Sequence, residues 1–332
     1  MRRLVTLDDI RAFEGTARPL WIRVSVAAAR VWFAFPRRIR VRAEGLQRVP
    51  VRGVRAILAS NHSHWYDFVP LRCTLFTELG RFAATWIKVR AFQNTAWRFY
   101  FARTGNVPLA SRGYIISADF LSVHGRKPTE EEYRPLRDHV NGLAKMPRGA
   151  IFERLGTLGR DLLGWKFDPE ASTYREAVLG CYTTMMRASL QVCGRALQAD
   201  HLLHVNPQGT ASQRLTPGRT GVIQAALALD CCVVPVGISG MCGAFAPYSL
   251  RPLGGQIVIR FGEPYRPSRE GLREDFQVFD PAHEEKNREY LERQAGILME
   301  RINDLCDPEY RRGPEGKSGS GGEGSKGVAR FL

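Results

Sequence analysis

Short apolar runs of strand length recur along the chain, separated by longer segments with helical periodicity. Turn residues such as Gly, Pro, Asn and Asp bound these runs, which is typical of buried β-strands. Strands that alternate with helices predict an α/β fold with a largely parallel central sheet flanked by helices, because parallel strands need a crossover connection. The expected strands are Ile39–Ala43, Val54–Ala59, Leu202–Val205, Cys232–Ile238 and Gln256–Phe261.

Helices are expected in most of the remaining chain. From Tyr174 to Ala196, apolar residues recur in alternating steps of three and four, which predicts a core-facing helix capped by Asp168, with Pro169 as its first residue. The region from Gly113 to Asp200 as a whole reads as mostly helical. Further helices are predicted over Thr77–Phe101, Gly221–Leu229 and Pro281–Asp304.

The composition limits the class of protein and of partner. A chain of 332 residues that is 44% hydrophobic and 24% charged is typical of a folded protein. Its 48 Lys and Arg against 33 Asp and Glu give a formal net charge of +15, which favours anionic partners. The arginines are dispersed and no nucleic-acid-binding module is recognisable, so we expect no nucleic acid but a membrane surface with anionic lipids.

The cysteines argue against a disulfide framework. Seven of them are scattered without a C-x-x-C pair, and no secretory leader is visible. An odd number of dispersed cysteines favours a reduced, cytoplasmic chain.

The segment Leu20–Phe35 is the most apolar part of the chain, but Arg23 and Arg30 interrupt it and it is shorter than the roughly 20 residues of a membrane span. On a helix, Trp21 and Trp32 share one stripe and the two arginines another. One interpretation is a helix in the head-group plane that makes the protein peripheral to the inner face of a membrane. The other is a helix packed on the core with two solvated arginines.

Three regions follow from these patterns. Residues 1–38 are predicted to be an amphipathic, membrane-surface region, and residues 39–310 the main domain, with a helical insertion at about 113–200. Residues 311–332 are rich in Gly and Ser and are predicted to be a disordered tail.

A polar cluster, His62-Ser-His64-Trp-Tyr-Asp67, follows the second expected strand directly. The carboxyl ends of parallel strands are where α/β sheets expose their chemistry. An imidazole whose tautomer is fixed by a carboxylate is suited to take a proton from a hydroxyl, which points to His62 and Asp67 as a general-base pair. A metal site made of His62, His64 and Asp67 is the competing interpretation.

Four blocks in order resemble the 1-acyl-glycerol-3-phosphate acyltransferase family of glycerolipid acyltransferases. Asn61-His62 with Asp67 matches its N-H-x-x-x-x-D block, and Gly105 through Arg112 its glycine, apolar stretch and arginine. The third block, F-P-E-G-T-R in the family, appears as Asn206-Pro-Gln-Gly-Thr-Ala211. The fourth is similar to Val233-Val-Pro-Val-Gly-Ile238.

The resemblance implies an O-acyltransferase of phospholipid or other lipid metabolism. Its substrates are an acyl donor thioester, either acyl-CoA or acyl-carrier protein, and a lipid acceptor hydroxyl, and it needs no cofactor and no metal. His62 and Asp67 are implied to be catalytic. Amides near Gly209 or near Val236-Gly237 are candidates for stabilising the oxyanion. The implied substrate-binding residues are Gly105, Arg112, Gln208, Gly209, Thr210 and Pro235, and the insertion is a candidate lid or wall.

Two departures from the family pattern bear on the acceptor. Gln208 and Ala211 stand where the third block has the glutamate and the arginine associated with a phosphorylated acceptor. A simple lysophosphatidate is therefore not the expected acceptor, and Arg214 and Arg219 are candidates for the lost cation. The same departures leave open a catalytically reduced relative that binds lipid, beside the metal-dependent hydrolase.

Overall fold

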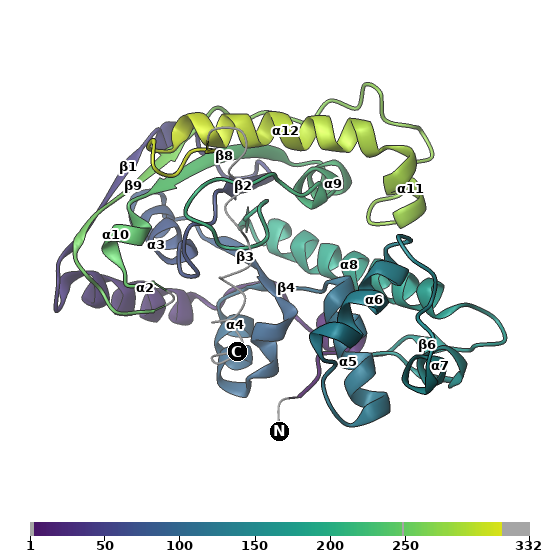
Figure 1. The fold of residues 1–332 in the computed structure, drawn as a ribbon. Helices are drawn as coiled ribbons and strands as arrows, with labels where there is room; N and C mark the ends of the chain where they lie inside the picture. The colour runs from purple at the N-terminus through teal and green to yellow at the C-terminus, as the bar shows by residue number, and fades with distance from the viewer. Residues whose placement is uncertain (1–2, 248, 314–332) are drawn as a thin grey trace.

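The computed structural model describes residues 3–247 and 249–313 and shows a three-layer α/β fold around a seven-stranded sheet (Figure 1). Neighbouring strands are parallel except for β8 and β9, which pair antiparallel. In sheet order the strands are β1 (Ile39–Glu44), β9 (Gly255–Phe261), β8 (Cys232–Ser239), β2 (Ala56–Ser60), β7 (Leu202–Val205), β3 (Ala83–Lys88) and β4 (Val107–Leu109).

Successive residues of the central strands point into two separate cores, one on each face of the sheet. Along β2, Ile57 and Ala59 lie in the first core, whereas Ala56 and Leu58 lie in the second. This alternation is the normal pleat of a strand buried on both faces, and it explains why the strand sequences are almost entirely apolar.

Helices cover both faces (Figure 1). The first core is closed by α1 (Leu7–Arg11), α5 (Arg112–His124), α6 (Glu130–Val140), α7 (Ala150–Thr157), α8 (Tyr174–Gln198), α9 (Gly221–Leu229) and α12 (Arg288–Leu305). The second is closed by α2 (Pro19–Ala34), α3 (Phe68–Leu79) and α10 (Met241–Ala244). The remaining elements are η1 (Leu46–Arg48), η2 (Val89–Gln93), α4 (Thr95–Arg103), α11 (Pro281–Lys286) and the small hairpin of β5 (Arg160–Asp161) and β6 (Lys166–Phe167).

The predicted α/β class and the expected strands are confirmed, but the helix predicted over Thr77–Phe101 is wrong. Strand β3 occupies its middle, between α3 and α4. The stretch Ala83-Ala-Thr-Trp-Ile-Lys88 contains β-branched and aromatic residues, and pairing with β7 in the sheet outweighs its helical spacing.

Two helix boundaries also differ from the prediction. Asp168 and Pro169 form a turn, and α8 begins later with a capping box between Thr173 and Glu176. The predicted helix Pro281–Asp304 is broken at Asn287, whose side chain bonds the carbonyl of His283 and accepts the amide of Arg273. Local polar side chains at these positions satisfy the backbone and end the helix.

The first residues of the chain belong to the main core. Leu7 and Ile10 are buried beside α8, and both backbone groups of Val5 bond the hydroxyl of Tyr114 in α5. The segment from Val5 to Phe13 is therefore packed in the first core, whereas α2 lies on the opposite face of the sheet. Most of the tail predicted for 311–332 lies outside the described residues.

Helix α2 forms where it is expected, but its tryptophans do not face outward. The indole of Trp32 donates to the carbonyl of Leu250 and packs 4.7 Å from the ring of Phe245, and Trp21 contacts Phe99 of α4 edge to face. Ridge packing on α3 buries one side of α2 and turns both indoles toward the protein. No helix within the described ranges has the length and apolarity needed to cross a bilayer.

Candidate active site

The polar cluster lies at the carboxyl end of β2, in the centre of the sheet. Strand β2 ends at Ser60, and a six-residue turn carries the chain to Asp67, the N-cap of α3. The strand is fully buried, so its end is held rigidly between β7 and β8. A parallel sheet thus presents His62 where its loops can close around a ligand.

His62 and Asp67 form the pair that the sequence predicts. The Nδ1 atom of His62 lies 2.8 Å from Oδ2 of Asp67, and their side chains are 19% and 1% exposed. The other carboxylate oxygen, Oδ1, is buried without a hydrogen-bond partner among the described residues, so the charge of Asp67 acts chiefly on His62. When Nδ1 carries the proton that bonds Asp67, the Nε2 atom has a lone pair available for a proton from outside.

Both peptide groups of His62 are also held. Its amide donates to Oε1 of Gln208 at 2.7 Å, and its carbonyl accepts the amide of Ser212 at 2.8 Å. One residue earlier, the side chain of Asn61 bonds both the amide and the carbonyl of Ile238 in β8. The backbone at His62 is therefore fixed between the segment after β7 and the end of β8.

A buried polar chain lies beneath this turn. Nε2 of His204 in β7 is 2.9 Å from Oγ of Ser60, and Nδ1 is 3.4 Å from Oγ1 of Thr85. The side chain of Asn206 donates to Oγ of Ser60 and to the carbonyl of Asn61. Burial lowers the pKa of His204 to about 4, with the Arg72 charge adding to the effect, so the imidazole is neutral at neutral pH.

This histidine predicts a specific loss of stability in mild acid. The unfolded chain takes up a proton near pH 6.5, whereas folded His204 does so only near pH 4. The unfolding free energy should therefore fall by about 3 kcal/mol as the pH drops from 6.5 to 4. Urea unfolding at pH 7.5, 6 and 5 measures this fall in unfolding free energy. In His204→Gln the part of the fall that is due to His204 should be absent. His139→Gln, at a partly exposed histidine, is the control; equal slopes in all three proteins would contradict the prediction.

His64 lies apart from the pair. It is buried, its Nε2 is 3.4 Å from the carbonyl of Ala246, and its ring stacks on Phe245 at 5.6 Å. Burial also lowers its pKa. His62, His64 and Asp67 therefore do not converge on one point, and within residues 3–247 and 249–313 no group of three His, Cys, Asp or Glu side chains is arranged to hold a metal ion. The geometry does not fit the metal-dependent hydrolase.

The substrate-binding residues predicted from the third block divide into two kinds. Gln208 is buried; besides accepting from His62, it donates to Oγ1 of Thr216 and the carbonyl of Arg214. Gln208 therefore positions His62, and its amide group suits this place because it can donate and accept at the same time. Gly209, at a φ of +69°, and exposed Thr210 border the accessible side of the turn.

Two other predicted residues are not brought to the site. Gly105 precedes β4 and so lies at the amino edge of the sheet, where a Cβ would come within 2.9 Å of the Ala17 nitrogen. Pro235 is buried inside β8, and its carbonyl accepts the amide of Gly262. Both residues pack against neighbouring segments. Arg112 does lie beyond the carboxyl end of β4, where it bonds Glu284 and Asn141.

The two candidate places for oxyanion amides also differ. Gly237 lies within the β8–β9 ladder, and a Cβ there would meet the backbone of Leu305 at 2.6 Å, so α12 covers it. After Gly209 the chain is open to solvent, and the amide of Thr210 donates to no other described residue. The amide next to the positive-φ turn is thus the available donor.

A lysine that the sequence reasoning missed joins this edge of the sheet. Lys88 ends β3, whose existence was hidden by the helix predicted there. The alternation of β-branched and aromatic residues before it is the signal that identifies a strand end. Lys88, Arg112 and Arg219, here called the cationic edge, come from three different segments that meet at the carboxyl side of the sheet.

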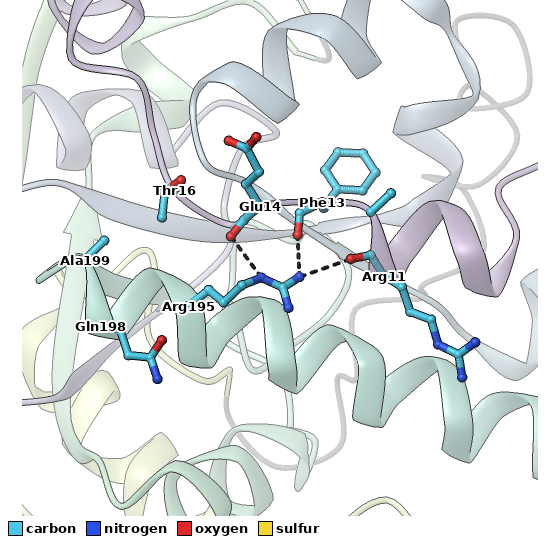
Figure 2. Close-up of a pocket in the computed structure, with 8 residues that line it drawn as sticks. Arg11, Phe13, Glu14, Thr16, Arg195, Gln198 and Ala199 are labelled. Carbon is cyan, nitrogen blue, oxygen red and sulfur yellow. Dashed lines mark hydrogen bonds between the residues drawn. The ribbon is translucent and has the colours of Figure 1, made fainter.

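A hollow of the surface lies away from this turn. It has a volume of about 540 Å³ and is lined by the end of α1, the residues after it and the end of α8 (Figure 2). Arg195 crosses it and donates to the carbonyls of Arg11, Phe13 and Glu14. Because α8 leads into the amino end of β7, the hollow lies at the opposite edge of the sheet from His62, and no histidine or cysteine lines it.

No protein-family profile and no curated protein matches the sequence. Among solved structures, the 1-acyl-sn-glycerophosphate (LPA) acyltransferase PlsC from Thermotoga maritima is similar, with 14% sequence identity over 88% of this chain and 79% of that chain and a TM-score of 0.40. The assignment of the site therefore rests on the geometry of this chain.

Proposed function

We propose that the protein is an acyltransferase that moves a fatty acyl group from a thioester, acyl-CoA or acyl-carrier protein, to the hydroxyl of a lipid acceptor. The 2.8 Å contact between Nδ1 of His62 and Oδ2 of Asp67 at the carboxyl end of β2 carries this proposal. The clamp on both peptide groups of His62 supports it, because a general base acts best when its position is fixed in advance.

The reaction needs one base and one oxyanion donor. Nε2 of His62 takes the proton of the acceptor hydroxyl as its oxygen attacks the thioester carbonyl carbon. Asp67, the N-cap of α3, stabilises the imidazolium so formed. The carbonyl oxygen becomes an oxyanion next to the amide of Thr210. The C–S bond then breaks, the thiolate takes the proton from Nε2, and an ester and a free thiol leave.

The test is incubation of purified protein with acyl-CoA and with acyl-carrier protein, each against lysolipid, glycolipid and amino-lipid acceptors, with products identified by mass. The proposal is supported if the acyl group is transferred to at least one acceptor and this transfer depends on His62. If the protein binds acylated lipids but transfers no acyl group with any donor and acceptor, it is instead a lipid-binding relative without catalysis.

We further propose that an exposed face of α2 binds a membrane surface. The face consists of Leu20, Val24, Val31 and Phe35, with alanines between them, and it is called here the α2 apolar face. Phe35, Val31 and Leu20 are 73%, 68% and 69% exposed, which is unusual for a row of large apolar side chains on one helix. Arg23 and Arg30 border it, so it complements an apolar layer under anionic head groups.

The α2 apolar face adjoins both an aromatic helix and the active-site turn. Trp97 and Phe99 of α4 are partly exposed beside its amino end, where Phe99 contacts Trp21. At its other end, Trp32 packs edge to face on Tyr66, the residue before Asp67, at 6.3 Å. A protein docked by this face would keep the His62 turn near the lipid that supplies the acceptor.

A further inference from the structure

The cationic edge holds more positive charge than its surroundings neutralise. Within the described ranges neither Lys88 nor Arg219 forms an ion pair, although both side chains are exposed to solvent. Arg112 forms an ion pair with Glu284 of α11, and the Glu284 carboxylate also accepts a hydrogen bond from the side chain of Gln224. Lys88 ends β3, which pairs with β7, and Arg219 lies in the segment that follows β7, so both cations lie on the carboxyl side of the sheet.

Arg219 lies directly against the third block. Its amide donates to the carbonyl of Pro207 at 2.9 Å, which fixes the loop before α9. Its side chain crosses Gly209 so closely that a Cβ added there would lie 2.9 Å from Nε. Gly209 follows Gln208, which holds the amide of His62. The guanidinium of Arg219 thus lies against Gly209, the residue that directly follows Gln208.

The charges of Arg112 and Arg219 both act on a tyrosine of the helical insertion. Tyr182 of α8 has its pKa raised to about 12 by burial and by the charge of Glu284, while Arg112 and Arg219 act in the opposite direction. The guanidinium of Arg112 lies 5.2 Å from the centre of this ring. Glu284 pairs with Arg112, whereas Arg219 has no acidic partner among the described residues and is available for an anion.

We propose that Arg219, together with Lys88, binds a phosphate group of the substrate and replaces the cation missing at Ala211. The inference rests on the proposed function, because it places that phosphate beside His62. Two like charges held together without an acid favour an anion between them, and a guanidinium with an ammonium is suited to phosphate. This arrangement removes the reason to expect an uncharged acceptor. The phosphate belongs either to the acceptor or to the CoA part of the donor.

Turnover by Arg219→Ala and Arg214→Ala distinguishes these sources. Arg214 is the matched control, because it is an exposed arginine of the same loop. The donors are acyl-CoA and acyl-pantetheine, which has no phosphate; the acceptors are lysophosphatidate and monoacylglycerol. Losing one charge-assisted contact should raise KM for the phosphate-bearing substrate about ten- to a hundredfold in Arg219→Ala, with Arg219→Lys in between. If KM rises only for lysophosphatidate, Arg219 binds the phosphate of the acceptor. If KM rises only for acyl-CoA, Arg219 binds a phosphate of the donor.

A binding measurement separates this inference from the proposed function. Calorimetry with CoA and with glycerol 3-phosphate needs no turnover. It should show weaker binding of one of them to Arg219→Ala and unchanged binding to Arg214→Ala. The inference is overturned if Arg219→Ala loses equal activity on acyl-pantetheine with monoacylglycerol, or if both variants bind like the wild type. Absence of turnover in every assay, with Arg219-dependent binding retained, refutes the acyltransferase and leaves the phosphate site.

Discussion

Replacing His62 with alanine is expected to lower the rate of acyl transfer by about 10²–10⁴-fold, because the variant has no group that removes the acceptor proton. Asp67→Asn should lower it severely as well, since an amide does not stabilise the imidazolium and can fix the wrong tautomer. His64→Ala should be tolerated far better, because His64 stacks on Phe245 and does not face the pair. Steady-state rates of the three variants against wild type test this order.

Melting temperatures must accompany these rates, because a misfolded variant imitates a catalytic one. His64→Ala is the variant most exposed to this error, since it leaves a buried cavity next to Phe245. Equal loss of activity in His64→Ala and His62→Ala, with stoichiometric zinc in the purified protein, would show that the histidines bind metal. Wild-type transfer by all three variants would place the active site elsewhere.

Replacing the α2 apolar face, Leu20, Val24, Val31 and Phe35, with serine should reduce binding to anionic vesicles about a hundredfold. Removing even about 0.8 kcal/mol of apolar burial at each position sums to about 3 kcal/mol. Co-sedimentation with phosphatidylserine vesicles measures this, and high salt should weaken the wild type further, because each arginine near the surface contributes about 1 kcal/mol.

The matched control is the double variant Val51→Ser and Leu143→Ser. These side chains are 74% and 77% exposed but lie in loops outside α2. The control should bind vesicles like the wild type. The fourfold variant contradicts this prediction if it keeps a wild-type melting temperature and still binds vesicles as the wild type does. Helix α2 would then only pack on the domain, and vesicle binding would not involve the α2 apolar face.

The sequence predicts best those elements whose apolar pattern and local turn or cap residues indicate the same structure. Leu202–Val205 and Gly221–Leu229 have the predicted bounds, and the apolar stripe of α8 is buried as expected. His62 and Asp67 were found together because they are only five positions apart in one turn. A local contact of this kind can be inferred from spacing and from the position at a strand's end.

What was missed depends on contacts between distant segments. Lys88 was hidden because the sheet pairing of β3 overrides a helical spacing. Gly105 matched a family position, yet only the packed chain shows Ala17 against it at the far edge of the sheet. Trp21 and Trp32 share a helical stripe, but which face of α2 meets the protein depends on α3. The ion pair of Arg112 with Glu284 likewise depends on how α11 lies against α5.

The clamp around His62 also ties catalysis to the order in which the chain folds. The hydrogen bond from His62 to Gln208 spans 146 residues of sequence, and those from Asn61 to Ile238 span 177. Contacts of this separation form late, after the entropy of closing long loops has been lost. A nascent chain that ends before β8 therefore carries both His62 and Asp67 without a fixed base. During refolding, any activity that depends on His62 should return no earlier than the central strands pair, so a partly made chain should lack it.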